Sequence, residues 1–184
     1  MNTDPKAVLL KVSFDVSQTS DALDWEFLPN SRPTKGDHAG GILFQPKEKL
    51  FLEIDGTGSD KSGFTGFDII ECCLITMPQI IQIGANLPLK YAPPSPFRDV
   101  PSAVFTFPHN FQDGIVPAPS EIVNRERQFK QTWQGDLVVA EALGRWELSF
   151  VVTVRIHYGT ARPSELRVFS FDPETEVGNG SAPP

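Results

Sequence analysis

The clearest pattern along the chain is an alternation of apolar and polar positions late in the sequence. Over residues 144–158 every second residue is apolar and the intervening positions are mostly polar. A period of two predicts a β-strand with one face on a core and the other toward water. At ~3.3 Å per residue this strand would be about 50 Å long, so we expect a bend, a bulge or a switch between sheets within it. The apolar positions are Trp146, Leu148, Phe150, Val152, Val154, Ile156 and Tyr158.

Shorter segments with a related pattern indicate further strands. Residues 8–16 and 49–55 alternate, whereas residues 67–77 are apolar on both sides, which is typical of a more buried, central strand. Gly, Pro, Asn and Asp separate the segments, as turns require. The sequence therefore predicts an all-β fold, either an antiparallel β-sandwich or a jelly roll. The remaining segments are residues 41–44, 103–107 and 166–171.

Two regions depart from this rhythm. Residues 120–133 fit a helix with Ser120 as its N-cap, but Phe129 and Trp133 also fit a strand, so the fold has at most one short helix. Residues 88–119 contain eight prolines. Because proline cannot donate to a central sheet ladder, we expect a long ordered excursion around a short strand, which either has a function or covers a sheet edge.

Length and charge narrow the class of protein. The 184 residues fit one domain, which we place at 1–177, followed by a disordered tail at 178–184. The net charge of −7 disfavours nucleic acid and anionic membranes as partners. No signal peptide and no membrane-spanning run are recognisable, so a cytoplasmic location is expected. Adjacent Cys72 and Cys73 fit two reduced thiols on opposite faces of a strand.

Motifs for nucleotide binding or for a nucleophilic serine are absent from the sequence, and no cofactor is predicted. The acidic segment 55–60 has oxygen donors at alternate positions, although it lacks the glycine and glutamate of an EF-hand. Asp55, Asp60 and Asp68, together with Glu53, are the candidate ligands of a metal ion. The alternative interpretation is a solvated hairpin loop between two strands.

Histidines and aromatic residues give a second candidate site. His38 lies in the glycine-rich segment 36–41, which is either a ligand loop or a simple turn. His109 lies between Phe107 and Phe111, and these three side chains would suit a groove for a carbohydrate or a peptide. Burial of this aromatic loop would count against such a groove.

The order of parts resembles a bacterial group, the inclusion-body protein PixA and the AidA-like proteins. A strand with an acidic loop spans 50–56 and a buried strand follows at 69–75. After the long strand comes the aromatic-Asp-Pro segment 171–173, which is similar to the one on which the family tends to finish. Gly56 and Thr57 stand where the family would have a tryptophan near the acidic loop. The resemblance implies a cytoplasmic β-sandwich with no known catalytic role, and it carries over no functional residue.

Two hypotheses of function follow. The first is a non-enzymatic β-sandwich that works by protein–protein interaction or self-assembly, with edge strands of two copies pairing into a homo-oligomer. The alternative is a jelly roll that binds a small ligand or a carbohydrate, with calcium assisting and weak hydrolysis as a further option.

Overall fold

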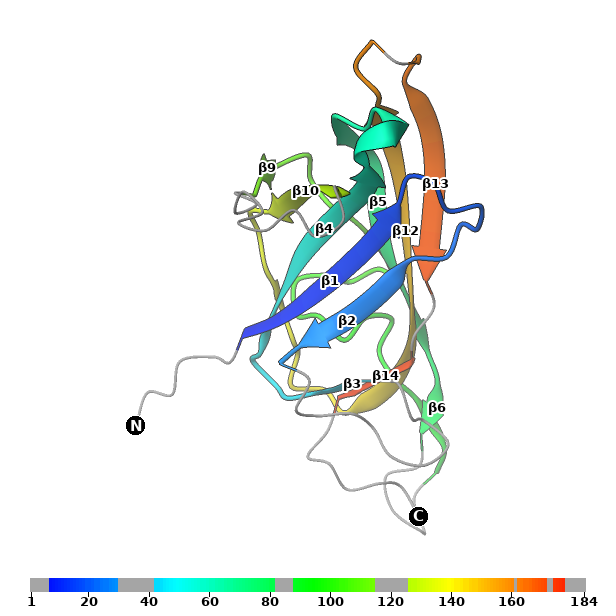
Figure 1. Ribbon diagram of the computed structural model, residues 1–184. Coiled ribbons are helices and arrows are strands. Elements are labelled where there is room, and N and C mark those ends of the chain that lie inside the picture. The colour runs from blue at the N-terminus through cyan, green and yellow to red at the C-terminus, as the bar shows by residue number, and fades with distance from the viewer. Residues whose placement is uncertain are drawn as a thin grey trace.

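The computed structural model describes residues 7–29, 42–81, 88–114, 126–160, 162–171 and 174–177. These residues form an all-β sandwich of two six-stranded sheets and a small two-stranded sheet. Strands β1, β2 and β4 of the first sheet cross in front of β5 and β12 of the second (Figure 1). The predicted fold class is confirmed. The sole helical element of the described residues is a 3-10 turn at Asp60–Ser62.

Sheet A, the first sheet, has the order β2-β1-β4-β10-β9, with β11 also pairing to β4. Its strands are β1 (Ala7–Asp15), β2 (Asp24–Leu28), β4 (Lys49–Ser59), β9 (Phe111–Asp113), β10 (Glu126–Trp133) and β11 (Leu137–Val138).

Sheet B, the second sheet, has the order β3-β14-β12-β5-β8, with β13 also pairing to β12. Its strands are β3 (Ile42–Phe44), β5 (Gly66–Pro78), β8 (Val104–Thr106), β12 (Gly144–His157), β13 (Glu165–Phe171) and β14 (Glu174–Val177). The small sheet pairs β6 (Ile80–Ile81) with β7 (Lys90–Tyr91).

Not every strand pair is antiparallel as predicted. β1 runs parallel to β4 over nine residue pairs, and β14 runs parallel to β3. The chain reaches β4 from β2 by way of β3 in the opposite sheet, so it re-enters sheet A in the direction of β1.

The long strand β12 organises sheet B as its alternation predicts. It pairs with β5 over almost its whole length, and its other edge is shared between β14 and β13. The predicted irregularity is present, because the register with β5 shifts between Thr153 and Val154 and leaves Ile70 of β5 without an opposite residue. All seven predicted apolar side chains are buried, each at 1% exposure or less.

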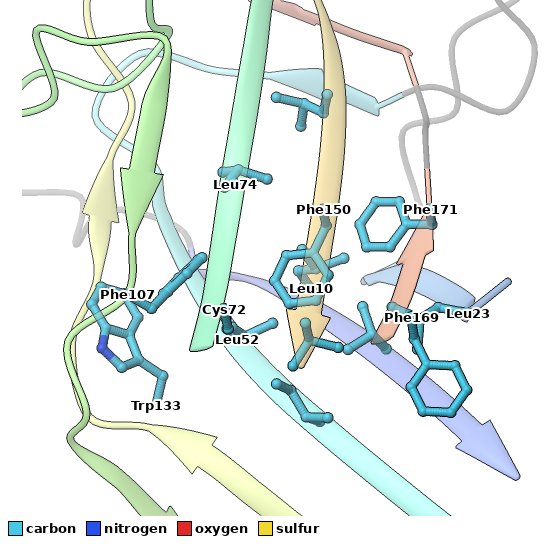
Figure 2. Packing of buried hydrophobic residues seen from close by; sticks show 14 of the residues in the cluster. Leu10, Leu23, Leu52, Cys72, Leu74, Phe107, Trp133, Phe150, Phe169 and Phe171 are labelled. Carbon is cyan, nitrogen blue, oxygen red and sulfur yellow. The ribbon is translucent and has the colours of Figure 1, made fainter. Parts of the chain in front are cut away.

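The core between the sheets is rich in aromatic rings. Phe14 of sheet A stacks on Phe169 of sheet B with ring centroids 4.7 Å apart, and Phe107 meets Trp133 edge-on at 5.0 Å. Figure 2 shows Phe107 and Trp133 together at one side, with Phe169 and Phe171 at the other. Such pairs add about 0.5–1.5 kcal/mol each beyond the area they bury.

The described part of the proline-rich segment is a packed cover, which was one of the two predicted outcomes. The indole N–H of Trp146 donates to the Pro93 carbonyl at 2.7 Å, and the Thr76 hydroxyl donates to the Pro94 carbonyl at 2.7 Å. Phe97 is buried within the same core as the two sheets. Proline carbonyls thus accept hydrogen bonds at a place where proline nitrogens cannot donate them.

Two local predictions are settled by the register. The described part of the ambiguous segment 120–133 is strand β10, which pairs with both β4 and β9. The acidic segment 55–60 is not a hairpin loop, because β4 continues through it to Ser59.

Gly56 and Gly58 of β4 face inward, where added Cβ atoms would lie only 2.9 Å from the Phe14 ring and 2.6 Å from Val16, respectively. Glycine is therefore required by close packing, not by a turn.

Replacing Gly56 with alanine is expected to lower the free energy of unfolding by about 1–3 kcal/mol, because the new methyl group overpacks two aromatic rings. Ser59→Ala, at the exposed end of the same strand, is the control and is expected to change it by less than about 0.5 kcal/mol. Urea unfolding measures both. Equal stability of Gly56→Ala and the wild-type protein would show that the close approach of Phe14 and Phe67 is not limiting.

Candidate interaction surface

The three candidate metal ligands each have a different partner. Asp55 accepts a hydrogen bond from the Gln128 amide at 2.8 Å and lies 3.4 Å from the Lys11 ammonium. Asp60 pairs with Arg127 at 2.9 Å. Within the described ranges, no group of three or more His, Cys, Asp or Glu side chains is arranged to hold a metal ion. The structure therefore does not bring the predicted acidic ligands together.

Asp68 belongs to a separate chain of polar groups at the end of sheet B. Its carboxylate lies 2.9 Å from Nε2 of His157, and Nδ1 of His157 lies 3.0 Å from the Ser164 hydroxyl. The order serine, histidine, aspartate is that of a nucleophile, a base and an orienting acid. Asp68 is 58% exposed and His157 is 35% exposed, so bulk water reaches these groups and competes for their hydrogen bonds. We interpret the chain as a polar tie between β5, β12 and the start of β13.

The predicted aromatic ligand groove is not formed as expected. Phe107 is 3% exposed and packs on Trp133 and Phe150, so its ring belongs to the core. His109 is exposed and Phe111 is half-buried. His38 and the segment 36–41 lie outside the described residues, as does the tail 178–184. The burial of Phe107 counts against a carbohydrate or peptide groove at this loop.

The outer faces of the two sheets differ in chemistry. The outer face of sheet A is charged at its middle, where Lys11 bridges Glu26 and Asp55, and Lys130 lies 2.7 Å from Glu53. The hydrogen bond to Glu53 raises the pKa of Lys130 above its usual range, and the Asp55 carboxylate adds to that shift. Charges of both signs pair along this face, so it is suited to contact with water.

Asp55 is buried at the centre of this charged face, at 1% exposure. Long side chains cover it, and its Oδ1 atom has no hydrogen-bond partner among the described residues. An uncompensated carboxylate in such a place is costly, so the nearby lysines stabilise it. The charged side chains of sheet A thus pair with one another on its outer face.

Sheet B carries an apolar band on its outer face. Its side chains alternate with the buried ones on β5, β8, β12 and β13, and the register places Val151 beside both Cys73 and Ser170. Ile75 lies between Ser149 and Val104 in the next row. We call this set the apolar band. Its members are Cys73, Ile75, Met77, Val104, Val151, Leu166 and Val168.

Several of the exposed large apolar residues belong to this band or continue it. Met77 is 54% exposed, Leu166 59% and Val168 55%. Beyond Met77, Ile80 and Tyr91 form an exposed cross-strand pair of the small sheet, at 50% and 65%. Scattered apolar residues are normal on a surface, but a continuous patch marks an interaction site.

Strand β13 adds an open edge to the band. Its Ser170 exchanges backbone hydrogen bonds of 2.9 Å with Asp21 and Leu23, on the side away from β12. Because backbone groups alternate along a strand, the N–H and C=O of Leu166 and Val168 also point away from β12. Among the described residues, no backbone hydrogen bond reaches them. Sequence alternation at 166–171 predicted the strand, but only the register reveals which edge is open.

Comparison with solved structures finds proteins of similar structure, although comparison of the sequence finds none. No known family profile and no curated protein matches the sequence. A crystal structure of the inclusion body protein PixA from Burkholderia cenocepacia is similar over 97% of this chain and 99% of that chain, at 11% identity and a TM-score of 0.39. Membership of the PixA and AidA-like group stays a prediction. No helix in the described part of the chain is long and apolar enough to cross a membrane.

A double-mutant cycle tests the charged face. Lys11→Met is expected to destabilise the protein by about 1–3 kcal/mol, because Asp55 keeps its buried charge and loses a cation. Asp55→Asn removes that charge. It is therefore expected to lower the free energy of unfolding less in the Lys11→Met variant than in the wild-type protein. Urea unfolding gives the coupling energy. Additive effects of the two substitutions would show that Lys11 does not compensate Asp55.

The two thiols are expected to react differently. Burial, aided by Cys73, raises the pKa of Cys72, and burial, aided by the Glu71 carboxylate, raises the pKa of Cys73. The half-buried Cys73 should react slowly with a thiol reagent at neutral pH and faster as the pH rises toward its pKa. Cys72 should react only after unfolding, and Cys73→Ser should abolish the native reaction. Rapid reaction of both thiols in the native protein would contradict this assignment.

Proposed function

We propose that this protein is a non-enzymatic β-sandwich that acts by self-assembly, with the apolar band of sheet B as the surface that joins copies. The contrast between the two outer faces supports the proposal. Paired charges occupy the middle of the outer face of sheet A, and its outward apolar residues Leu9, Leu28 and Phe51 are only partly exposed. Sheet B instead leaves Met77, Val104 and Val168 about half exposed. Burial of apolar area gives about 25 cal/mol per Å², so covering exposed residues of the band would stabilise an assembly.

Charge also favours contact through sheet B. The chain has a net charge of −7, so two copies repel each other on average. The ionisable side chains that lie on the same face as the band include two arginines and three carboxylates, so the charges on this face are close to balance. These are Arg145, Arg155, Asp68, Glu71 and Glu147. Contact through this face therefore avoids most of the repulsion between copies.

The proposal includes a cytoplasmic location. Cys72 and Cys73 are both free thiols. Free thiols persist in a reducing compartment, so the two free cysteines support this location.

The test is the mass in solution as a function of concentration. The wild-type protein is expected to rise above the monomer mass of 20.3 kDa as concentration increases. Met77→Lys/Val168→Lys adds two charges to the band and should keep the protein monomeric. The control, Gln112→Lys/Ser59→Lys, adds the same charges to exposed positions of sheet A and should associate like the wild-type protein. A monomer at every concentration, or equal association of both variants, would overturn the proposal.

A further inference from the structure

Within the proposed self-assembly, we infer that two copies join edge to edge through β13, with Leu166 of each copy opposite Leu166 of the other. This inference rests on the proposed function and names the strand, the partner and the register. The partner is a second copy of this chain, related by a two-fold axis, because antiparallel pairing of identical strands is self-complementary.

The open part of the edge limits the register. Leu166 and Val168 offer outward backbone groups, whereas those of Ser170 are already bonded to Asp21 and Leu23. The guanidinium of Arg167 also contacts the carbonyls of Val16 and Ser20, at 3.4 and 3.3 Å. The segment before β2 therefore covers the C-terminal end of β13, and a second copy can pair only with the N-terminal half.

Charge then selects between the two registers that this half allows. With Leu166 on the two-fold axis, Glu165 of each copy lies opposite Arg167 of the other, which gives two pairs of opposite charge. With Arg167 on the axis, the two arginines face each other. Directly opposed like charges are destabilising and opposite charges are stabilising, so the register centred on Leu166 is favoured.

The apolar side chains also gain contacts in the register centred on Leu166. Leu166 and Val168 both project to the outer face of sheet B, at 59% and 55% exposure. Across the two-fold axis the leucines become direct neighbours, and each valine lies diagonal to the leucine of the other copy. Four exposed side chains would thus shield one another, and the two sheets B would form one continuous sheet.

The open edge is short, so the expected dimer is weak. An interface of this length buries less than the ~1,200 Å² of a standard stable complex. We expect a reversible dimer with a Kd weaker than about 1 μM. Such a dimer would be detected by sedimentation over about 10 μM to 1 mM.

Cross-linking tests the register directly. In the Cys73→Ser background, Leu166→Cys places two thiols opposite each other with Cα atoms about 5.5 Å apart, a distance that a disulfide spans. Mild oxidation should give a covalent dimer on a non-reducing gel. Val168→Cys should not, because its two copies would be about 13 Å apart along the strands. Val104→Cys, on the opposite edge of sheet B, controls for random collisions.

The outcomes separate this inference from the proposed function. A covalent dimer from Leu166→Cys alone supports pairing through β13 in this register. If the wild-type protein associates but Leu166→Cys cross-links no better than Val104→Cys, the β13 edge is wrong and self-assembly through another part of the band stands. Efficient cross-linking of Val168→Cys overturns the register. A wild-type protein that stays monomeric up to about 1 mM overturns both.

Discussion

The structure depends on the pairing of β12 with its neighbours and on the burial of one face of that strand. Seven side chains from Trp146 to Tyr158 lie in the core at 1% exposure or less. The same strand holds β5 along one edge, and β14 and then β13 along the other. Loss of one large buried ring, such as that of Phe150, would cost about 3–5 kcal/mol, a large fraction of the total stability of a domain.

That constraint also determines what sheet B shows to the outside. Each residue buried on β12 or β5 has neighbours that point outward, and several of these, including Cys73, Ile75 and Val151, are apolar. Sheet A has the same geometry but carries charges outward, with Asp55 held between Lys11 and Gln128. The two outer faces therefore have the same architecture but differ in how much apolar surface they expose, and self-assembly through sheet B is the consequence that we propose.

Much of the fold could be predicted because alternation reports burial directly. The long strand, its irregularity and the opposite faces of Cys72 and Cys73 all follow from a period of two. Pairing partners could not be predicted, because alternation says nothing about which strands lie side by side. The parallel pairing of β1 with β4 and the contacts of Asp60 with Arg127 and Asp68 with His157 depend on that missing information.

The sites were harder to predict for a related reason. One interpretation of segment 55–60 was a hairpin loop, yet Gly56 and Gly58 lie within strand β4. The rings of Phe14 and Phe67 leave no room for a side chain at Gly56. Phe107 suggested a ligand groove, yet its ring is part of the core. The open edge of β13 has no sequence signature beyond Leu166 and Val168. It is open because the segment before β2 makes backbone hydrogen bonds to Ser170 and not to these two residues.

Hydrogen–deuterium exchange of β13 at low and high protein concentration is the most direct measurement of the central claim. In the monomer the amides of Leu166 and Val168 point away from β12 and should exchange quickly, whereas that of Phe169 should be protected. The account predicts that the Leu166 and Val168 amides gain protection as concentration rises, while the amides of β8 at the opposite edge do not change. Unchanged exchange of Leu166 and Val168 in a sample whose mass has doubled would contradict it.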